Sequence, residues 1–152
     1  MSDTIHLVAH TCCHKGGKAD IALSLSLRHY AQQLLRCVLA VHERGFAHLD
    51  LKPKHFLQFG GDWKLVDFDN AQPEGAELPA TAAACTVRYA APEVVRARRA
   101  AEPLRASSAA DVWAMALVLC HLFTGEPVHG DAELEGIEEQ LASRPHEVAL
   151  QA

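Results

Sequence analysis

Two acidic residues on either side of a predicted β-hairpin constrain the fold of this chain most strongly. The apolar runs Phe56–Phe59 and Trp63–Val66 are separated by Gly60-Gly61-Asp62, which is typical of antiparallel strands joined by a tight turn. Asp50 lies shortly before this hairpin, and Asp67 follows it directly. Both carboxylates are therefore expected at loop positions, each near a short apolar strand.

Phosphoryl transfer uses two such carboxylates, one to orient a hydroxyl nucleophile and one to hold the magnesium that bridges the phosphates. The runs His48-Leu49-Asp50-Leu51-Lys52-Pro53-Lys54-His55 and Asp67-Phe68-Asp69 resemble the catalytic and metal-binding loops of eukaryotic-type protein kinases. Three further stretches follow the order of that family. They resemble the helix before the catalytic loop, the end of the activation segment and the opening of the central helix of the large lobe: Arg28–Gly45, Thr86–Glu93 and Asp111–Ala114. Together, these ordered motifs indicate the family.

The resemblance implies a role for each candidate site residue. Asp50 matches the catalytic base, Lys52 the lysine that steadies the transferred phosphate, and Thr86 the threonine that packs against both. Lys52 also implies a serine or threonine acceptor in a protein substrate. Asp67 matches the magnesium ligand. The alternative for Asp50 and Asp67 is that they only cap loops.

Other matching positions are expected to hold loops in place and not to act on the substrate. These scaffold positions are His48, Tyr89, Pro92, Glu93 and Asp111.

Three substitutions depart from the family pattern. Leu49 replaces the arginine beside the base, so no cation there can pair with an activation-loop phosphate. His55 replaces the asparagine whose oxygen binds the second magnesium, and imidazole is a poor ligand for that ion. Asp69 replaces a glycine, where aspartate can keep a left-handed turn and adds a carboxylate near Asp67.

The family's phosphate-holding elements have no counterpart in the sequence. No G-x-G-x-x-G motif and no V-A-I-K lysine occur among the 152 residues. The resemblance therefore implies a mainly α fold with small β-hairpins, that of the large C-terminal lobe of a protein kinase, with the small lobe essentially absent. We expect a truncated chain that is inactive alone, and ATP with Mg²⁺ or Mn²⁺ as the cofactor that the resemblance implies.

One partial kinase domain is expected over residues 1–152, with a hinge at 5–24, a catalytic core at 25–125 and an acidic helix at 131–142. Helical periodicity from Leu27 predicts an amphipathic helix that Ser24 or Ser26 caps and that ends at a left-handed Gly45. The helix Val112–Phe123 is apolar almost all round, which predicts complete burial and an end at Gly125. Residues 73–84 are expected to form a mobile loop, and the acidic helix to pack through Leu134, Ile137 and Leu141.

Composition and charge limit the classes of partner and the cellular locations that are expected for this chain. A formal net charge of −5 argues against a nucleic-acid binder. No apolar run is long enough to span a membrane, and residues 1–4 do not begin a signal peptide, so a cytoplasmic or nuclear location is expected.

A short strand is predicted at 5–8. The cluster His10, Cys12, Cys13 and His14 is interpreted as a polar turn, with a soft-metal site as the alternative.

Two functions of different classes remain open. The first is ATP-dependent phosphorylation of protein serine or threonine. The second is a non-catalytic pseudokinase that acts as a protein-binding module, which Leu49, His55 and Asp69 favour. A metal-binding protein built on the ten dispersed histidines is a third hypothesis.

Overall fold

The computed structural model describes residues 21–79, 86–130 and 132–143, and its helices are accompanied by small antiparallel sheets. The elements along the chain are α2 (Ile21–His42), β1 (Phe46–Ala47), the 3-10 turn η1 (Pro53–His55), β2 (Phe56–Phe59), β3 (Asp62–Leu65), β4 (Gln72–Pro73), β5 (Glu77–Leu78), the 3-10 turn η3 (Val87–Tyr89), α3 (Pro92–Ala100), β6 (Leu104–Arg105), α4 (Ser108–Thr124) and α5 (Leu134–Ala142).

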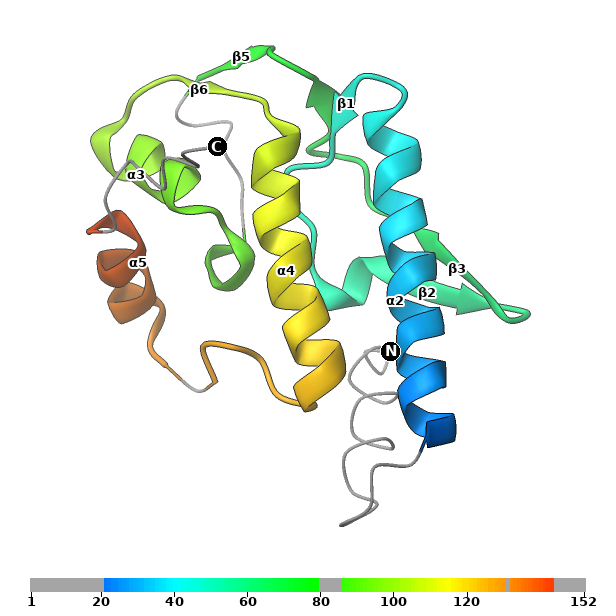
Figure 1. The fold of residues 1–152 in the computed structure, drawn as a ribbon. Helices are drawn as coiled ribbons and strands as arrows, with labels where there is room; N and C mark the ends of the chain where they lie inside the picture. The colour runs from blue at the N-terminus through cyan, green and yellow to red at the C-terminus, as the bar shows by residue number, and fades with distance from the viewer. Residues whose placement is uncertain (1–20, 80–85, 131, 144–152) are drawn as a thin grey trace, which may run out of the picture.

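The helix α4 lies at the centre of the arrangement (Figure 1). The helix α2 runs antiparallel to it on one side, with the β2–β3 hairpin against α2. The helices α3 and α5 pack against each other on the opposite side. The loop that carries Asp50 follows β1 and precedes η1 in the chain.

The buried face of α2 follows the helical repeat that the sequence predicts. Leu27, Ala31, Leu34 and Val38 are buried and point toward α4 and the hairpin as part of one core cluster. The helix begins at Ile21, so Ser24 and Ser26 lie inside it and the prediction that they cap it was wrong. Gly45 is left-handed as predicted, with a φ of +76° that glycine adopts without steric cost, but the helix itself ends three residues earlier, at His42.

The largest core cluster joins α2, the hairpin and α4. Leu34, Phe56, Val118 and Leu122 are each fully buried in it. Full burial of one such side chain contributes about 1.5–3 kcal/mol to folding. The core therefore fixes the hairpin, and the loops at its ends, against the helix pair.

The prediction that α4 is buried all round was wrong. Val112 is 63% exposed and Phe123 is 46% exposed, whereas Val118 and Leu122 are completely buried. An all-apolar sequence carries no polar face to reveal which side meets solvent, so periodicity could not separate the two sides. The helix does end as expected, with Gly125 in the left-handed region at φ +81°.

The expected loop at 73–84 contains short strands, so that prediction was wrong for residues 73, 77 and 78. β4 pairs antiparallel with β1, and β5 pairs with β6. These pairs are only two residues long, and a pattern of alternation cannot show itself over such a length. The predicted hairpin is confirmed, with Phe56 opposite Leu65 and Phe59 opposite Asp62. Residues 80–85 lie outside the described residues.

Other boundaries differ in detail. Residues 21–24 of the expected hinge belong to α2, whereas the rest of the hinge and the strand at 5–8 lie outside the described residues, as does the cysteine–histidine cluster at 10–14. In α5, Ile137 and Leu141 are buried as predicted. Leu134 is 52% exposed, because it is the first residue of the helix and precedes its packed face.

Candidate functional site

Asp50, Lys52 and Thr86 form one closed hydrogen-bond network. The Lys52 ammonium donates to Asp50 Oδ2 at 2.5 Å and to Thr86 Oγ1 at 2.7 Å. The Thr86 hydroxyl donates to Asp50 Oδ1 at 2.8 Å, and the Thr86 N–H donates to the same oxygen at 3.1 Å. Residues separated by 36 positions in sequence are thus brought together as the sequence analysis expected.

The network keeps Asp50 ionised. Burial alone would raise the pKa of Asp50, but the hydrogen bonds from Lys52 and Thr86, together with the Lys52 charge, outweigh it and lower that pKa. The side chains of Asp50 and Lys52 are only 10% and 12% exposed, so solvent screens their interaction weakly. The site therefore presents a fixed carboxylate beside a fixed ammonium.

Asp111, at the start of α4, anchors the backbone of the Asp50 loop. Its carboxylate accepts hydrogen bonds from His48 N–H at 2.7 Å and Leu49 N–H at 2.8 Å, and the residue is 1% exposed. Leu49 lies in the left-handed region with φ +66°, which costs about 1–3 kcal/mol for a non-glycine residue. The two hydrogen bonds offset this strain and fix the direction in which Asp50 leaves the loop.

His42 supports the same carboxylate and was not selected as a site residue from the sequence. It is the last residue of α2, and its Nε2 lies 2.8 Å from Asp111 Oδ2. The contact ties the C-terminus of α2 to the N-terminus of α4. The sequence offered one signal for His42. The residue directly follows the last apolar residue of the predicted helix, shortly before the loop that carries Asp50.

His48 connects the two acidic loops from its fully buried position. Its Nε2 lies 3.2 Å from the carbonyl oxygen of Val66, and its Nδ1 is 3.4 Å from the backbone nitrogen of Asp50. A tautomer protonated at Nε2 satisfies both contacts. The ring also packs 5.1 Å from the Phe68 ring, between centroids. His48 therefore holds the segment before Asp67 against the Asp50 loop.

His55 and Asp67 face each other at the second acidic position. His55 Nε2 lies 2.9 Å from Asp67 Oδ2, but the two groups are not aligned for a hydrogen bond. Neither ring nitrogen of His55 makes a hydrogen bond within the described residues, although the residue is only 2% exposed. Burial first, and then the Lys52 charge, lower the pKa of His55, so the ring is neutral near pH 7. A buried neutral nitrogen beside a carboxylate is an arrangement that a cation would complete.

These two residues fit a divalent metal only in part. A separation of 2.9 Å suits neighbouring ligands of one octahedral ion, whose bonds are about 2.0–2.2 Å long. The carboxylate of Asp67 is 44% exposed and accessible to an ion. The imidazole nitrogen of His55 suits Mn²⁺ better than Mg²⁺, which prefers oxygen ligands. No set of three histidine, cysteine, aspartate or glutamate side chains converges within the described ranges, so His55 and Asp67 supply only part of a metal's ligand set there.

Asp69 does not play the structural role expected of it. Among non-glycine residues described, the left-handed residues are Leu49, Asp67 and Ala101, so the left-handed turn of this loop is at Asp67 and not at Asp69. Asp69 is exposed and does not join His55 and Asp67 in a three-ligand set. The resemblance to the family motif predicted a left-handed residue at Asp69, but the backbone has it two residues earlier, at Asp67.

The remaining scaffold positions lie after Thr86. Tyr89 Oη is 3.4 Å from Nδ1 of His121 in α4. Pro92 is buried at the first position of α3, where proline needs no hydrogen-bond donor. Glu93 is exposed in the first turn of the same helix, where its negative charge interacts favourably with the positive end of the helix dipole.

No helix in the described part of the chain has both the length and the apolar character required to cross a membrane.

Comparison with known proteins adds an independent line of evidence. The profile of the family described as Protein kinase domain matches residues 8–149. The chain is 34% identical over 102 residues to "Cyclin-dependent kinase F-3" of Oryza sativa subsp. japonica, covering 67% of this chain and 22% of that protein. It is 34% identical over 119 residues to "Protein kinase gsk31" of Schizosaccharomyces pombe, covering 76% and 30%.

A third relative is "Serine/threonine-protein kinase MAK" of Rattus norvegicus, which is 33% identical over 116 residues, covering 73% of this chain and 17% of that protein. The chain thus spans between 17% and 30% of the length of these three relatives.

Proposed function

The chain belongs to the protein kinase domain family, and we propose that its site serves the ATP-dependent phosphorylation of serine or threonine in a protein substrate. We also propose that the described fold corresponds to the large lobe of a kinase. The observation that carries the proposal is the closed network of Asp50, Lys52 and Thr86, which leaves specific atoms free for a substrate.

The free atoms follow from counting donors and acceptors. Among the described residues, Asp50 Oδ1 already accepts two hydrogen bonds from Thr86, whereas Oδ2 accepts one, from Lys52. Oδ2 can therefore accept the hydrogen bond of a substrate hydroxyl. Since Lys52 uses two of its three N–H donors on Asp50 and Thr86, the third can donate to a phosphate oxygen. The hydroxyl and the phosphate would thus meet beside the same pair of side chains.

This geometry supports positioning and electrostatic stabilisation. Phosphoryl transfer passes through a loose transition state, so orientation of the hydroxyl matters more than early removal of its proton. The lowered pKa of Asp50 agrees with that role, because the carboxylate stays ionised and accepts the proton only as transfer completes. Lys52 stabilises negative charge on the transferred group.

Asp67 and His55 would supply part of the ligand set for a divalent metal bound with ATP. When bound, the metal would neutralise negative charge on the phosphates. Asp67 would supply an oxygen and His55 a nitrogen, both from side chains that the loop conformation already places 2.9 Å apart. The nitrogen donor favours Mn²⁺ as the working ion.

A non-catalytic binding module is the second candidate, and two observations favour it. His55 lies against Asp67 without a hydrogen bond, and in the metal-free protein it blocks one side of that carboxylate. Leu49 offers no charge for an activation-loop phosphate. In this alternative the acidic loops would bind no nucleotide.

Thermal unfolding with and without ATP and Mn²⁺ discriminates between the two candidates. A ligand that binds only the folded state raises the melting temperature. We expect a rise that is lost in Asp67→Ala, with Asp69→Ala as the matched control on the neighbouring exposed carboxylate. No rise in the parent protein would favour the binding module.

Transfer by the 152-residue chain alone is expected at the background rate. The chain contains no glycine-rich loop and no lysine of the V-A-I-K type to hold the phosphates. Loss of one preorganised electrostatic donor costs about 3 kcal/mol of transition-state stabilisation. Radiolabelled ATP with a generic protein substrate tests this. Incorporation that disappears in Asp50→Ala would contradict the expectation of inactivity while supporting the role of Asp50.

A further inference from the structure

The helices α2 and α4 share an apolar face that the proposed function does not use. A groove of about 440 Å³ runs between the two helices, and the network of Asp50 does not line it. Three large apolar side chains of its lining remain exposed to solvent: Leu35 at 45%, Leu39 at 53% and Val112 at 63%. A contiguous apolar patch on a folded domain marks a surface that binds a partner.

The solvent side of α4 carries no charge. Asp111 and His121 are the acidic and basic residues of this helix, and they are only 1% and 5% exposed. The row that faces away from the core consists of apolar side chains at helical spacing: Val112, Ala116, Leu119 and Phe123. A helix that meets water on one side ordinarily has polar residues there. The row is therefore the side of α4 that another apolar surface would cover.

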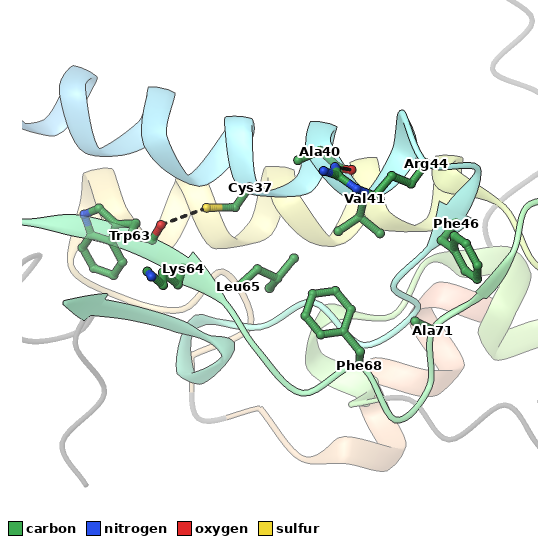
Figure 2. A pocket seen from close by; sticks show the side chains of 10 residues that line it. All are labelled: Cys37, Ala40, Val41, Arg44, Phe46, Trp63, Lys64, Leu65, Phe68 and Ala71. Carbon is green, nitrogen blue, oxygen red and sulfur yellow. Dashed lines mark hydrogen bonds between the residues drawn. The ribbon is translucent and has the colours of Figure 1, made fainter.

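The side of α2 that faces β3 already has a partner within the chain. Figure 2 shows Cys37 and Val41 on that side, where the Cys37 thiol donates a hydrogen bond to the Trp63 carbonyl oxygen at 3.2 Å. Leu35 and Leu39 lie on a different side of the helix, since they line the groove next to α4. The apolar face defined by this groove thus has no partner among the described residues.

The relative height of the two helices follows from one contact. His42 at the end of α2 lies beside Asp111 near the start of α4, and the helices run antiparallel. Each helix rises by about 1.5 Å per residue, so seven residues back along α2 and seven forward along α4 bring Leu35 level with Val118. Leu35 and Val118 therefore lie near the middle of the face.

The row on α4 is complementary to itself when it is reversed. In a second copy related by a two-fold axis just before Val118, Phe123 would face Val112 of the first copy. Leu119 would likewise face Ala116, and the small alanine leaves room for the larger side chain. A two-fold interface requires a patch that is complementary to itself in this way.

The same axis pairs opposite charges on α2. Spacings of seven, four and four residues place Arg28, Leu35, Leu39 and Glu43 along one side of this helix and its C-terminal end. Because Leu35 is level with Val118, the axis passes just after Leu35, and Arg28 of each copy would face Glu43 of the other. Both side chains are exposed, and neither forms an ion pair within the described part of the chain. The dimer would contain this pair twice.

The face has the dimensions of a stable interface. The 17 residues of α4 give it a length of about 25 Å, and two helices packed about 10 Å apart give it a width of about 20 Å. A standard interface buries about 800 Å² on each partner. A corrugated face has more accessible surface than its flat projection, here about 500 Å², and so comes close to that size.

From these observations we infer that a second copy of this chain covers the α2–α4 face, in an antiparallel two-fold dimer. The apolar rows of the two α4 helices form the centre of the interface, and the pairs of Arg28 with Glu43 lie toward its two ends. The inference does not depend on the proposed kinase function, because the network of Asp50 does not line the face.

Sedimentation equilibrium of the 152-residue chain, from about 1 to about 100 μM, tests the inference. We expect the mass to rise to twice the 16.5 kDa of one chain and no further, because a two-fold interface closes on itself. The mass of one chain at every concentration would overturn the inference and leave the face to a different partner. Masses that keep rising beyond two chains would overturn it as well, since they indicate an open contact.

Exchange of charges tests how the two copies are arranged. Arg28→Glu and Glu43→Arg each set like charges together at two symmetry-related places, so each is expected to weaken dimerisation about tenfold. The double variant Arg28→Glu/Glu43→Arg restores both ion pairs and should return to within about threefold of the parent protein. Glu139→Arg, on the exposed side of α5, is the matched control and should have no effect. A double variant that dimerises as weakly as the single variants, or single variants that dimerise as tightly as the parent, would refute the arrangement.

Ala116→Glu tests the centre of the interface. The new carboxylate would be buried against Leu119 of the second copy, and an unpaired buried charge is strongly unfavourable. Ala116 is exposed in the single chain, so the variant should fold like the parent protein in circular dichroism and sediment as one chain. A folded Ala116→Glu variant that dimerises as tightly as the parent would show that the α2–α4 face is not the interface.

Discussion

Replacement of Asp111 by alanine tests how the loop of Asp50 is held, and the size of the effect can be worked out from the contacts of its carboxylate. In the folded protein that carboxylate is 1% exposed and receives hydrogen bonds from His48 N–H, Leu49 N–H and the His42 ring. Alanine would leave these donors without their partner. A buried unsatisfied donor costs about 1–3 kcal/mol, so the two backbone donors together cost about 2–6 kcal/mol.

We therefore expect Asp111→Ala to lower the free energy of unfolding by about 2–6 kcal/mol. Asp111→Asn is the conservative control, because its single oxygen can accept from one backbone N–H but its amide group faces the other with a second donor. It should cost less than alanine but more than about 1 kcal/mol. His42→Ala removes one of the three contacts and leaves both backbone hydrogen bonds, so about 1–2 kcal/mol is expected.

Urea unfolding followed by far-ultraviolet circular dichroism measures these differences, provided that the slope against denaturant stays constant. The order of destabilisation expected is alanine, then asparagine at position 111, then His42→Ala. A loss below about 0.5 kcal/mol for Asp111→Ala would be that of an ordinary surface substitution. It would refute the reasoning that this carboxylate anchors the strained loop at Leu49.

Two further predictions concern packing and protonation. Leu122→Ala should cost about 2–5 kcal/mol because it creates a cavity in the core, whereas Val112→Ala on the exposed side of α4 should stay within about 0.5 kcal/mol; equal losses in urea titrations would contradict the assignment of faces. The pKa of His55 is lower in the folded protein than in the unfolded chain, so the unfolded chain binds the proton first as the pH falls. The contribution of neutral His55 to stability is therefore complete above the unfolded pKa of about 6.5 and is lost as the pH falls through the folded pKa. In metal-free buffer, His55→Asn should therefore reduce the decline in the free energy of unfolding below about pH 6.5. If the free energy of unfolding of the variant falls with pH as steeply as that of the parent protein, the His55 ring does not cause the decline.

The sequence predicted the parts of the fold that local signals specify. The hairpin was predictable because a glycine pair separates two apolar runs, and Gly45 and Gly125 both have the positive φ that was expected of them. Family motifs also selected Asp50, Lys52 and Thr86, which the structure brings into one network.

The remaining features depend on tertiary contacts that no local pattern reports. The exposed side of α4 is set by which neighbours cover it, and its uniform apolar composition cannot show this. The short strands β4 and β5 exist because β1 and β6 lie opposite them, many residues away. The role of His42 depends on the contact of its ring with Asp111, which lies 69 residues away in the sequence.

The central claim is that the loops of Asp50 and Asp67 form one phosphoryl-transfer site, and ATP affinity measured by calorimetry in Mn²⁺ and in Mg²⁺ tests it most directly. We predict binding that is tighter in Mn²⁺, that weakens at least tenfold, or about 1.4 kcal/mol, in Asp67→Ala, and whose Mn²⁺ preference falls in His55→Asn. Asp69→Ala should leave the affinity unchanged. ATP binding that is absent in both metals, or that is indifferent to Asp67→Ala, would contradict the claim.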